Sequence, residues 1–248
     1  MKNKTIFITG GNDGIGKVTA ELFSSLGANV SIMGRRPEKN AAAQSEIASK
    51  GGQCIALTGD VTKADDVQRA ITKTYDHFSS LHYAFNNGGA PQTPKPFTET
   101  TEEEYYALTD AHIKGIWQCM KNEIPLIIKS GGGAIVNNSS AAGLVGQLMM
   151  PLYSACKHAM LGLTKSAALE YAKQEVRINA VCPGPTATPN YVNSPGLTPA
   201  LRKQIESSVP MNRVSTCEEV AQAVLYLCRD ATSTTGASLL IDGGITAQ

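Results

Sequence analysis

A hydroxyl, a phenol and an amine occur at a spacing that could carry proton transfer. Tyr153 follows Ser140 by thirteen residues and precedes Lys157 by four. Residues four apart on a helix project from one face, so Tyr153 and Lys157 are expected to address the same site. A phenol has a reference pKa of about 10, which a nearby positive charge lowers. Together the three groups could donate a proton to an oxygen bound to carbon, or abstract one from it.

A glycine-rich turn, Thr9-Gly10-Gly11-Asn12-Asp13-Gly14-Ile15-Gly16, follows the first apolar run. Without Cβ atoms the backbone can approach a pyrophosphate closely, and the free N–H groups of a following helix attract the anion. Such a turn is also typical of an ordinary strand-to-helix connection, and Tyr153 with Lys157 could be a packed ring beside an amine that reaches solvent. The combination of both patterns indicates hydride transfer with a dinucleotide.

The end of the second predicted strand bears on the choice of cofactor. An acidic residue there would bind the 2′-hydroxyl of NAD, whereas a basic one would pair with the 2′-phosphate of NADP. The chain has Gly34-Arg35-Arg36, with no carboxylate and two guanidiniums suited to bidentate phosphate binding. We therefore expect NADP(H) to be preferred, with NAD(H) as the alternative. In that alternative the two arginines are solvated loop charges, and Asp13 could pair with one of them.

Polar residues also follow the third and fourth predicted strands. Asp60-Val61 closes the third, where the carboxylate could accept a hydrogen bond from the adenine amino group. Asn86-Asn87-Gly88 closes the fourth, where amide side chains could brace the loop beside the cofactor. Both sets are expected at the carboxyl edge of the sheet, which is where open α/β sheets bind ligands.

Short β-branched runs alternate with longer helical patterns, which predicts βαβ units and a parallel sheet. The expected strands are Thr5–Thr9, Asn29–Met33, Gln53–Leu57, Leu81–Asn86, Ala134–Asn138, Arg177–Val181 and Ser238–Ile241. The expected helices are Gly14–Leu26, Glu38–Lys50, Lys63–Phe78, Thr101–Lys129, Leu152–Lys173 and Cys217–Arg229. The predicted fold class is α/β: a Rossmann-type doubly wound sheet of about seven parallel strands with helices on both faces, in a single domain over residues 1–248.

A long, proline-rich irregular stretch runs from Pro183 to Met211. Loops of this length inside a compact domain are usually functional. We interpret residues 184–212 as a cover over the substrate, with a short helix around Pro199–Ser207. The alternative is a passive surface excursion.

Whole-chain composition argues against several classes of partner. The 248 residues carry a net charge of +1, which gives no reason to expect nucleic acid or an anionic membrane surface. No apolar run approaches the roughly 20 residues that span a bilayer, and the run near Met1 is too short for a secretory signal. The six cysteines form no C-x-x-C pair, and the four histidines show no metal-ligand spacing. We therefore expect a cytoplasmic protein with free thiols and no metal, acting on a small molecule.

From about Lys4 to Ile245 the chain resembles a classical short-chain dehydrogenase/reductase. The matching positions are Thr9-Gly10-x-x-x-Gly14-x-Gly16, Asp60, Asn86-Asn87-Gly88, Ser140, Tyr153-x-x-x-Lys157, Pro183-Gly184 with Thr188, and Asp242-Gly243-Gly244. The resemblance implies that Ser140, Tyr153 and Lys157 are catalytic, with Tyr153 as the general acid/base. It also implies that the segment after Gly184 contacts the nicotinamide, that Thr188 binds its carboxamide, and that the protein is a homo-oligomer, a tetramer or dimer.

The residues that we expect to bind the cofactor are Gly10, Asn12, Asp13, Gly14, Ile15, Gly16, Arg35, Arg36, Asp60, Val61, Asn87, Gly88, Tyr153, Lys157, Pro183, Gly184, Thr186 and Thr188. Two departures from the family pattern occur. The usual Asn-Asn-Ala-Gly reads Asn86-Asn87-Gly88-Gly89, and His112 stands three residues before Gly115, where the family commonly has an asparagine in a proton relay. Imidazole donates and accepts, so His112 could be the fourth catalytic residue with a different pH profile. Alternatively, it is only packed in a long helix.

The residues expected to face the substrate are mostly apolar and include adaptable methionines. They are Gly89, Ala90, Ala141, Ala142, Leu148, Met149, Met150, Tyr191 and Met211. We therefore expect an NAD(P)(H)-dependent oxidoreductase that interconverts a ketone and a secondary alcohol on a small, mainly apolar substrate. The alternatives are a 3-oxoacyl-carrier-protein reductase, which would need a basic patch for its acidic carrier, and a non-catalytic dinucleotide-binding redox sensor.

Overall fold

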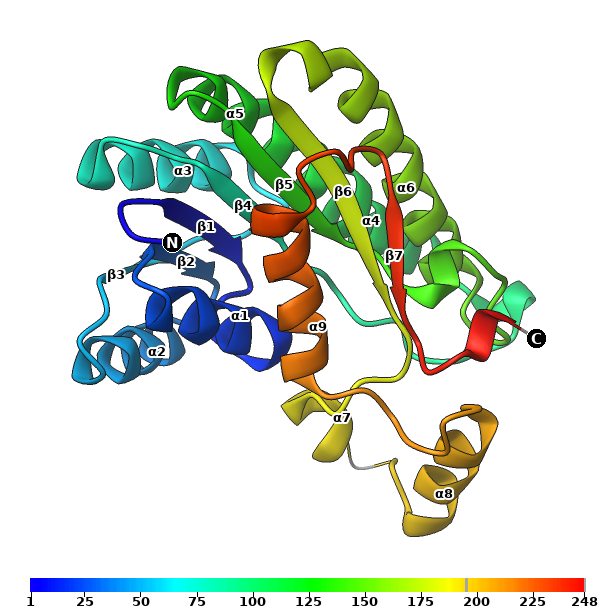
Figure 1. Ribbon diagram of the computed structural model, residues 1–248. Helices are drawn as coiled ribbons and strands as arrows, with labels where there is room; N and C mark the ends of the chain where they lie inside the picture. The colour runs from blue at the N-terminus through cyan, green and yellow to red at the C-terminus, as the bar shows by residue number, and fades with distance from the viewer. Residues whose placement is uncertain (195, 248) are drawn as a thin grey trace.

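Seven parallel strands form one sheet in the computed structural model, which describes residues 1–194 and 196–247. The strands are β1 (Thr5–Thr9), β2 (Asn29–Gly34), β3 (Cys54–Thr58), β4 (Tyr83–Asn86), β5 (Gly133–Asn138), β6 (Val176–Pro183) and β7 (Ser238–Ile241). Their spatial order is β3-β2-β1-β4-β5-β6-β7 (Figure 1). This confirms the predicted doubly wound α/β sheet, and the strand ends differ from those predicted by at most two residues.

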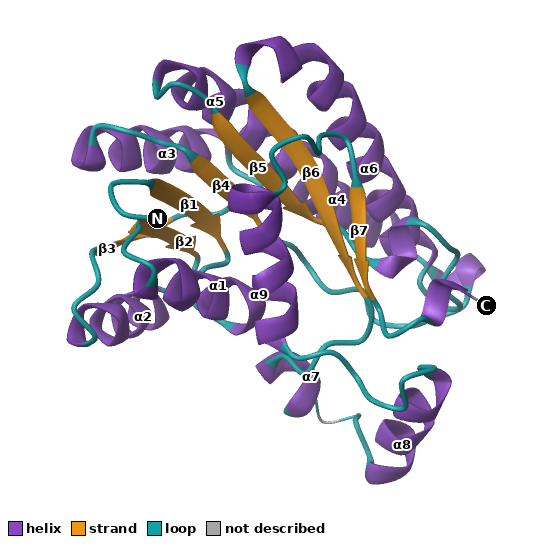
Figure 2. Ribbon diagram, in the orientation of Figure 1, coloured by secondary structure: helices purple, strands orange, loops and turns teal. Residues whose placement is uncertain are grey.

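Helices cover both faces of the sheet (Figure 2). One face carries α1 (Gly14–Ser25), α2 (Pro37–Ser49) and α9 (Cys217–Leu225), and the other carries α3 (Ala64–Phe78), α5 (Gly115–Lys129) and α6 (Pro151–Tyr171). The strands are apolar on both sides because each face packs against helices. In β1, Ile6 and Ile8 belong to the core beneath α1 and α9, whereas Phe7 between them belongs to the core beneath α3 and α5.

The predicted helix Thr101–Lys129 is not a single regular helix. It consists of α4 (Glu102–Thr109), a π-helical turn at Asp110–Lys114, and α5. Gly115 follows the turn and packs tightly: a Cβ there would lie 3.0 Å from the main-chain oxygen of Val61. Wider turns of this kind commonly re-aim a functional side chain. The predicted helix Cys217–Arg229 likewise ends at Leu225 and continues as a π-helical turn.

Residues 184–212 contain more helix than the sequence suggested. The expected short helix is present as α8 (Pro199–Ser208), and an additional helix, α7 (Pro189–Val192), precedes it. Residue 195 in this segment, and residue 248 at the chain end, lie outside the described residues. Within the described part of the chain, no helix is long and apolar enough to cross a membrane.

A polar network is enclosed in the core between the sheet and α5. Nδ2 of Asn86 donates to Oε2 of Glu123 and to Oδ1 of Asn137, both at 3.0 Å, and Asn137 donates onward to Thr164 at 2.9 Å. Glu123 is fully buried, and burial raises the pKa of its carboxyl to about 8 although the Asn86 bond opposes the shift. The Glu123 side chain is therefore mainly protonated at neutral pH.

Candidate active site

The glycine turn lies where the strand order reverses, between the carboxyl ends of β1 and β4. Asn87, just past β4, donates from its backbone to Oγ1 of Thr9 at 3.0 Å and from Nδ2 to the main-chain oxygen of Gly10 at 3.2 Å. Gly10 has a φ of 64°, and a Cβ on Gly16 would overlap the Gly10 oxygen and lie 2.7 Å from Nδ2 of Asn87. The turn therefore needs glycine at both positions.

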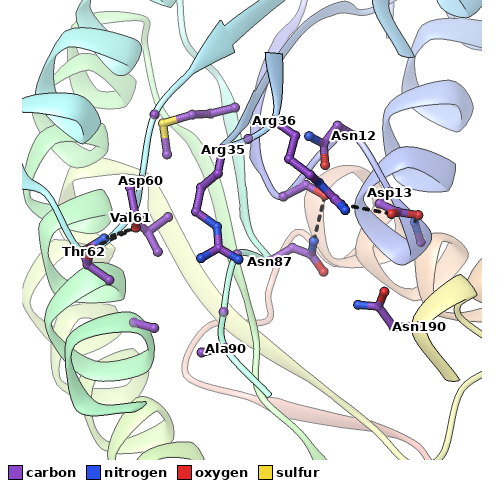
Figure 3. A pocket seen from close by; sticks show the side chains of 18 of the residues that line it. Asn12, Asp13, Arg35, Arg36, Asp60, Val61, Thr62, Asn87, Ala90 and Asn190 are labelled. Atoms are coloured by element: carbon purple, nitrogen blue, oxygen red, sulfur yellow. Dashed lines mark hydrogen bonds and ion pairs between the residues drawn. The ribbon is translucent and has the colours of Figure 1, made fainter. Parts of the chain in front are cut away.

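A cavity of about 520 Å³ opens at this switch point (Figure 3). Twelve residues predicted to bind the cofactor line it: Gly10, Asn12, Asp13, Gly14, Ile15, Arg35, Arg36, Asp60, Val61, Asn87, Gly88 and Thr188. The other predicted residues, Gly16, Tyr153, Lys157, Pro183, Gly184 and Thr186, are not among its lining. Open α/β sheets bind nucleotides at this place, and the close-packed glycine backbone suits a pyrophosphate.

Lys39 and Arg36 pair with the carboxylate of Asp13 at the rim of the cavity beside β2, and Arg35 lies next to Arg36 in the chain. Oδ2 of Asp13 lies 2.7 Å from Nζ of Lys39 and 3.2 Å from the guanidinium of Arg36. Burial raises the pKa of Asp13, but Lys39 and Arg36 outweigh this and hold the pKa below its usual value. Arg35 makes no ion pair with residues 1–194 or 196–247, and its guanidinium points into the cavity in Figure 3. Arg35 is therefore the cation free to meet an anion.

Two asparagine side chains occupy the space beside Gly34 at the tip of β2. A Cβ on Gly34 would overlap the amide of Asn12 and lie 2.6 Å from Oδ1 of Asn40. The two asparagines are hydrogen bonded to each other at 2.5 Å, and Asn40 also donates to the Gly34 oxygen at 2.9 Å. A carboxylate at this position would have to displace this pair of asparagine side chains.

Asp60 lies two residues past β3, in the wall of the same cavity. Its Oδ1 accepts from the backbone and the hydroxyl of Thr62 at 3.0 and 2.9 Å. These bonds fix the carboxylate, and Figure 3 shows Asp60, Val61 and Thr62 together on one side of the opening.

Tyr153 and Lys157 lie one turn apart near the start of α6. Lys157 is 5% exposed, and its Nζ donates to the main-chain oxygen of Asn138 at 2.7 Å. The same Nζ lies 5.4 Å from the centre of the Tyr153 ring. Burial lowers the pKa of Lys157 to about 8. Lys157 is therefore mainly protonated at neutral pH, but it releases its proton at a lower pH than a surface lysine does.

Ser140 begins a short 3₁₀ turn directly after β5. Its Oγ accepts from the backbone of Ala142 at 3.1 Å and donates to the main-chain oxygen of Pro183 at 3.4 Å. Burial raises the pKa of the Tyr153 phenol, and a hydrogen bond with Ser140 acts in the opposite direction. The fold thus brings together the hydroxyl, phenol and amine that the sequence separates by up to seventeen residues.

His112 lies in the π-helical turn and contacts this group. Its ring packs edge-on against Tyr153 with centroids 5.6 Å apart, and its Nε2 lies 2.7 Å from the main-chain oxygen of Ala90. Nδ1 is buried without a hydrogen-bond partner in the described structure. Burial, and then the charge of Lys157, lower the pKa of His112 to about 3. The imidazole is therefore neutral at physiological pH and adds no titration of its own there.

The residues expected to face a substrate are divided among several environments. Gly89 and Ala90 line the cavity, whereas Ala141 and Ala142 are buried. Leu148 is 90% exposed. Met211, 60% exposed, lines a separate depression with Arg213 and Leu240.

Comparison with known proteins identifies the family. A family model described as enoyl-(acyl carrier protein) reductase matches residues 10–246. The 2,5-dichloro-2,5-cyclohexadiene-1,4-diol dehydrogenase of Sphingobium indicum is 38% identical, and the alignment covers 100% of this chain and 98% of that protein. The cyclohexanol dehydrogenase of an Acinetobacter species is 35% identical, with 100% and 97% covered. A short-chain type dehydrogenase/reductase from Mycobacterium ulcerans has a similar structure, with a TM-score of 0.95, 28% identity, and 100% and 91% of the two chains covered. The chain belongs to the short-chain dehydrogenase/reductase family.

This short-chain dehydrogenase/reductase is an oxidoreductase that acts on alcohol or carbonyl groups with a nicotinamide dinucleotide. The family resemblance and the enzyme class predicted from the sequence are thereby confirmed. Thr62, Asp110 and Asn190 also line the cavity and were not predicted, because the sequence pattern does not show which side chains face it. Gln92 was likewise not predicted, although its Oε1 accepts from the backbone N–H of Tyr153 at 2.8 Å.

Proposed function

We propose that this enzyme interconverts a ketone and a secondary alcohol on a small, mainly apolar substrate, with Tyr153 as the general acid/base. The observation that carries the proposal is the cluster of half-buried Ser140 and Tyr153 with the buried Lys157 beside the cavity. The cluster adjoins the cavity because His112 contacts both Tyr153 and Ala90, and Ala90 lines the cavity wall.

The cavity suits a nicotinamide dinucleotide. Gly10 and Gly14, which line the cavity, would admit a pyrophosphate at the start of α1, and Asp60 could accept a hydrogen bond from adenine. The side chain of Thr188 would lie 3.5 Å from a Cβ on Gly14. Helix α7 begins directly after Thr188, so it covers the glycine turn on the side where the nicotinamide half would lie. When bound, the nicotinamide supplies or accepts the hydride.

The protein side of the reaction is a proton transfer. In reduction Tyr153 gives its phenolic proton to the substrate oxygen, and in oxidation the phenolate takes it back. Burial keeps the pKa of the phenol above its usual value, and the positive charge of Lys157, 5.4 Å from the ring centre, would favour the phenolate when the proton leaves. Ser140 holds the substrate oxygen and stabilises the negative charge that develops on it. Lys157 would also hydrogen-bond the nicotinamide ribose.

We further propose that NADP(H) is preferred over NAD(H). Arg35 reaches into the cavity beside β2, and the tip of β2 is Gly34, which has no carboxylate to bind a ribose 2′-hydroxyl. Arg36 is partly engaged by Asp13, so Arg35 would be the main partner of a 2′-phosphate.

The relatives favour a cyclic substrate. The names of the two dehydrogenases compared above specify alcohols on six-membered carbon rings, and both align with the whole of this chain. A ring alcohol or ring ketone agrees with the apolar residues assigned to the substrate side. We propose this class as the substrate.

Two alternatives are less well supported. A carrier-protein reductase, suggested also by the description of the family model, would need free cations near the site for an acidic carrier. Arg202 and Arg213, in the region that follows β6, are both paired with glutamates. A non-catalytic redox sensor would have no use for the cluster of Ser140, Tyr153 and Lys157.

We also propose a homotetramer or homodimer in the cytoplasm, with residues 184–212 covering the substrate in a single-domain subunit. Tyr105, Tyr106 and Trp117, all about half-exposed, project from α4 and α5 and would be covered on association. Light scattering on the purified protein tests the assembly.

The function is tested with a panel of cyclic and linear ketones and alcohols, each with both cofactors, followed by the absorbance of the reduced nicotinamide. The expected result is turnover of ring alcohols or ketones with NADP(H) favoured. Faster turnover of a 3-oxoacyl carrier substrate would favour the first alternative. Cofactor binding without any turnover would favour the second.

A further inference from the structure

Helix α6, which carries Tyr153 and Lys157, begins without a cap from its own chain segment. Its N-cap residue is Met150, and no side chain at that position bonds a free N–H of the first turn. Pro151 occupies the first helical position, where its missing N–H does no harm. The N–H of Tyr153, two residues further on, is one that an N-cap side chain would normally satisfy.

Gln92 satisfies this N–H from another part of the chain. It lies in the loop after β4, sixty-one residues before Tyr153, and its Oε1 accepts from the Tyr153 backbone at 2.8 Å. The side chain is 7% exposed. The acceptor therefore sits in a shielded position, where one hydrogen bond restricts the helix more firmly than it would in water.

The NH₂ group of the Gln92 amide is not stabilised in this position. Its Nε2 is buried and finds no hydrogen-bond partner in the part of the chain that the structure describes. An amide buried with an unpaired NH₂ is less stable than an apolar side chain of similar shape. Fold stability alone thus gives no reason for a glutamine at this position, whereas the contact with Tyr153 does.

The loop that carries Gln92 is fixed on both sides. The Ala90 oxygen bonds His112 at 2.7 Å, and the Lys95 backbone donates to the Met149 oxygen at 2.9 Å. Nζ of Lys95 is also paired with Glu104 of α4 at 2.7 Å. Gln92 is therefore held between two anchored points, and it transmits their position to the first turn of α6.

We propose that Gln92 is a positioning residue for Tyr153: its amide oxygen caps α6 across the active-site wall and fixes the phenol relative to Lys157 and Ser140. The inference rests on the proposed role of Tyr153. An error of about 1 Å in the position of a reacting group lowers turnover strongly, so loss of the cap should affect catalysis more than folding.

The test compares three variants in the intact enzyme. Gln92→Met keeps the length of the side chain but loses the acceptor, Gln92→Glu retains an acceptor, and Thr93→Val changes an exposed neighbour as the control. Turnover of cyclohexanol, or of the panel compound oxidised fastest, is measured against pH with saturating cofactor. Cofactor affinity and thermal midpoint are measured on the same samples.

Gln92→Met is expected to lower kcat at least about tenfold. Its thermal midpoint should stay within about 2 °C of the parent, because the lost bond is offset by removal of the unpaired amide group. The midpoint of the acidic limb of kcat should rise, since the phenol moves away from Lys157. Gln92→Glu should restore kcat to within about threefold, and Thr93→Val should match the parent.

An unchanged kcat and pH profile in Gln92→Met would overturn the inference, as would equal losses in the Met and Glu variants. Tyr153→Phe is assayed alongside to separate the two proposals. If Tyr153→Phe is inactive while Gln92→Met is normal, only the role of Gln92 fails. If Tyr153→Phe is fully active, the proposed general acid/base fails and the role of Gln92 fails with it.

Discussion

A side chain at residue 89 and the imidazole of His112 exclude each other. A Cβ on Gly89 would overlap the ring, lying 3.0 Å from Nδ1 and closer still to Cε1. The ring in turn packs edge-on against Tyr153 and bonds the oxygen of Ala90. The cavity wall and the phenol are therefore coupled through one neutral imidazole.

Because His112 is uncharged above about pH 4, replacing it by asparagine should leave the pH midpoints of kcat/KM unchanged between about pH 5 and 9. His112→Phe, which cannot bond Ala90, is expected to lower kcat about tenfold. Steady-state kinetics across this pH range check both outcomes. Disappearance of a pH limb in His112→Asn would show that the imidazole titrates in the reaction.

Tyr153→Phe should lower kcat at least about a hundredfold, the usual scale for loss of a general acid/base. Cofactor affinity, measured by fluorescence titration, should change little, because the residues that line the cavity are untouched. Tyr105→Phe on α4, where the ring is half-exposed, is the matched control and should behave as the parent. Activity near the parent level in Tyr153→Phe would remove this residue from the mechanism.

Arg35→Ala should weaken NADP⁺ binding about tenfold to a hundredfold, the effect of losing one charge-assisted contact, while NAD⁺ binding stays within about twofold. Arg36→Ala should have a smaller effect because Asp13 already engages that guanidinium. Dissociation constants for both cofactors provide the measurement, with Arg229→Ala as a control at an exposed ion pair. Equal losses for the two cofactors would reverse the proposed preference.

Glu123→Gln should change the pH dependence of stability. The carboxyl ionises near pH 4.5 when unfolded but at about 8 when folded, so the folded state keeps a proton that the unfolded chain has released. Stability is therefore lost as pH rises from about 4.5 to 8, and the loss is complete above that range.

The variant removes this titration. Its thermal midpoint should exceed that of the parent by at least about 3 °C near pH 9 and should approach it near pH 5. The exposed Glu99→Gln serves as the control and should show the parent's pH dependence. A constant difference between the Glu123 variant and the parent at all pH values would contradict the assignment.

The sequence predicted those features whose signal is local. Short β-branched runs located all seven strands, and the glycine turn follows the first of them as expected. Neighbouring residues in the chain determine both features. The possible pairing of Asp13 with an arginine was also anticipated, and Arg36, twenty-three residues away, makes it.

Features set by contacts between distant segments were not predicted. The π-helical turn at Asp110–Lys114 lies beside the close contact of Gly115 with Val61, a contact between distant segments that no helical pattern encodes. The sequence also gives no sign that Gln92 caps α6, because Gln92 lies in a proline-rich loop sixty-one residues away from Tyr153. The sequence does contain a signal for Glu123. It shares the inward face of α5 with Ile116 and Ile127, and a carboxyl is unusual on an otherwise apolar helix face.

The crowding of Asn12 and Asn40 around Gly34 limits how this enzyme could be re-engineered. Exchanging glycine for aspartate at the tip of β2, the simplest route toward an NAD-specific catalyst, would force two hydrogen-bonded amides apart before the carboxylate reached a ribose. Coenzyme reversal here therefore involves the pair Asn12 and Asn40 as well as Gly34, and shorter residues at 12 and 40 would relieve the crowding.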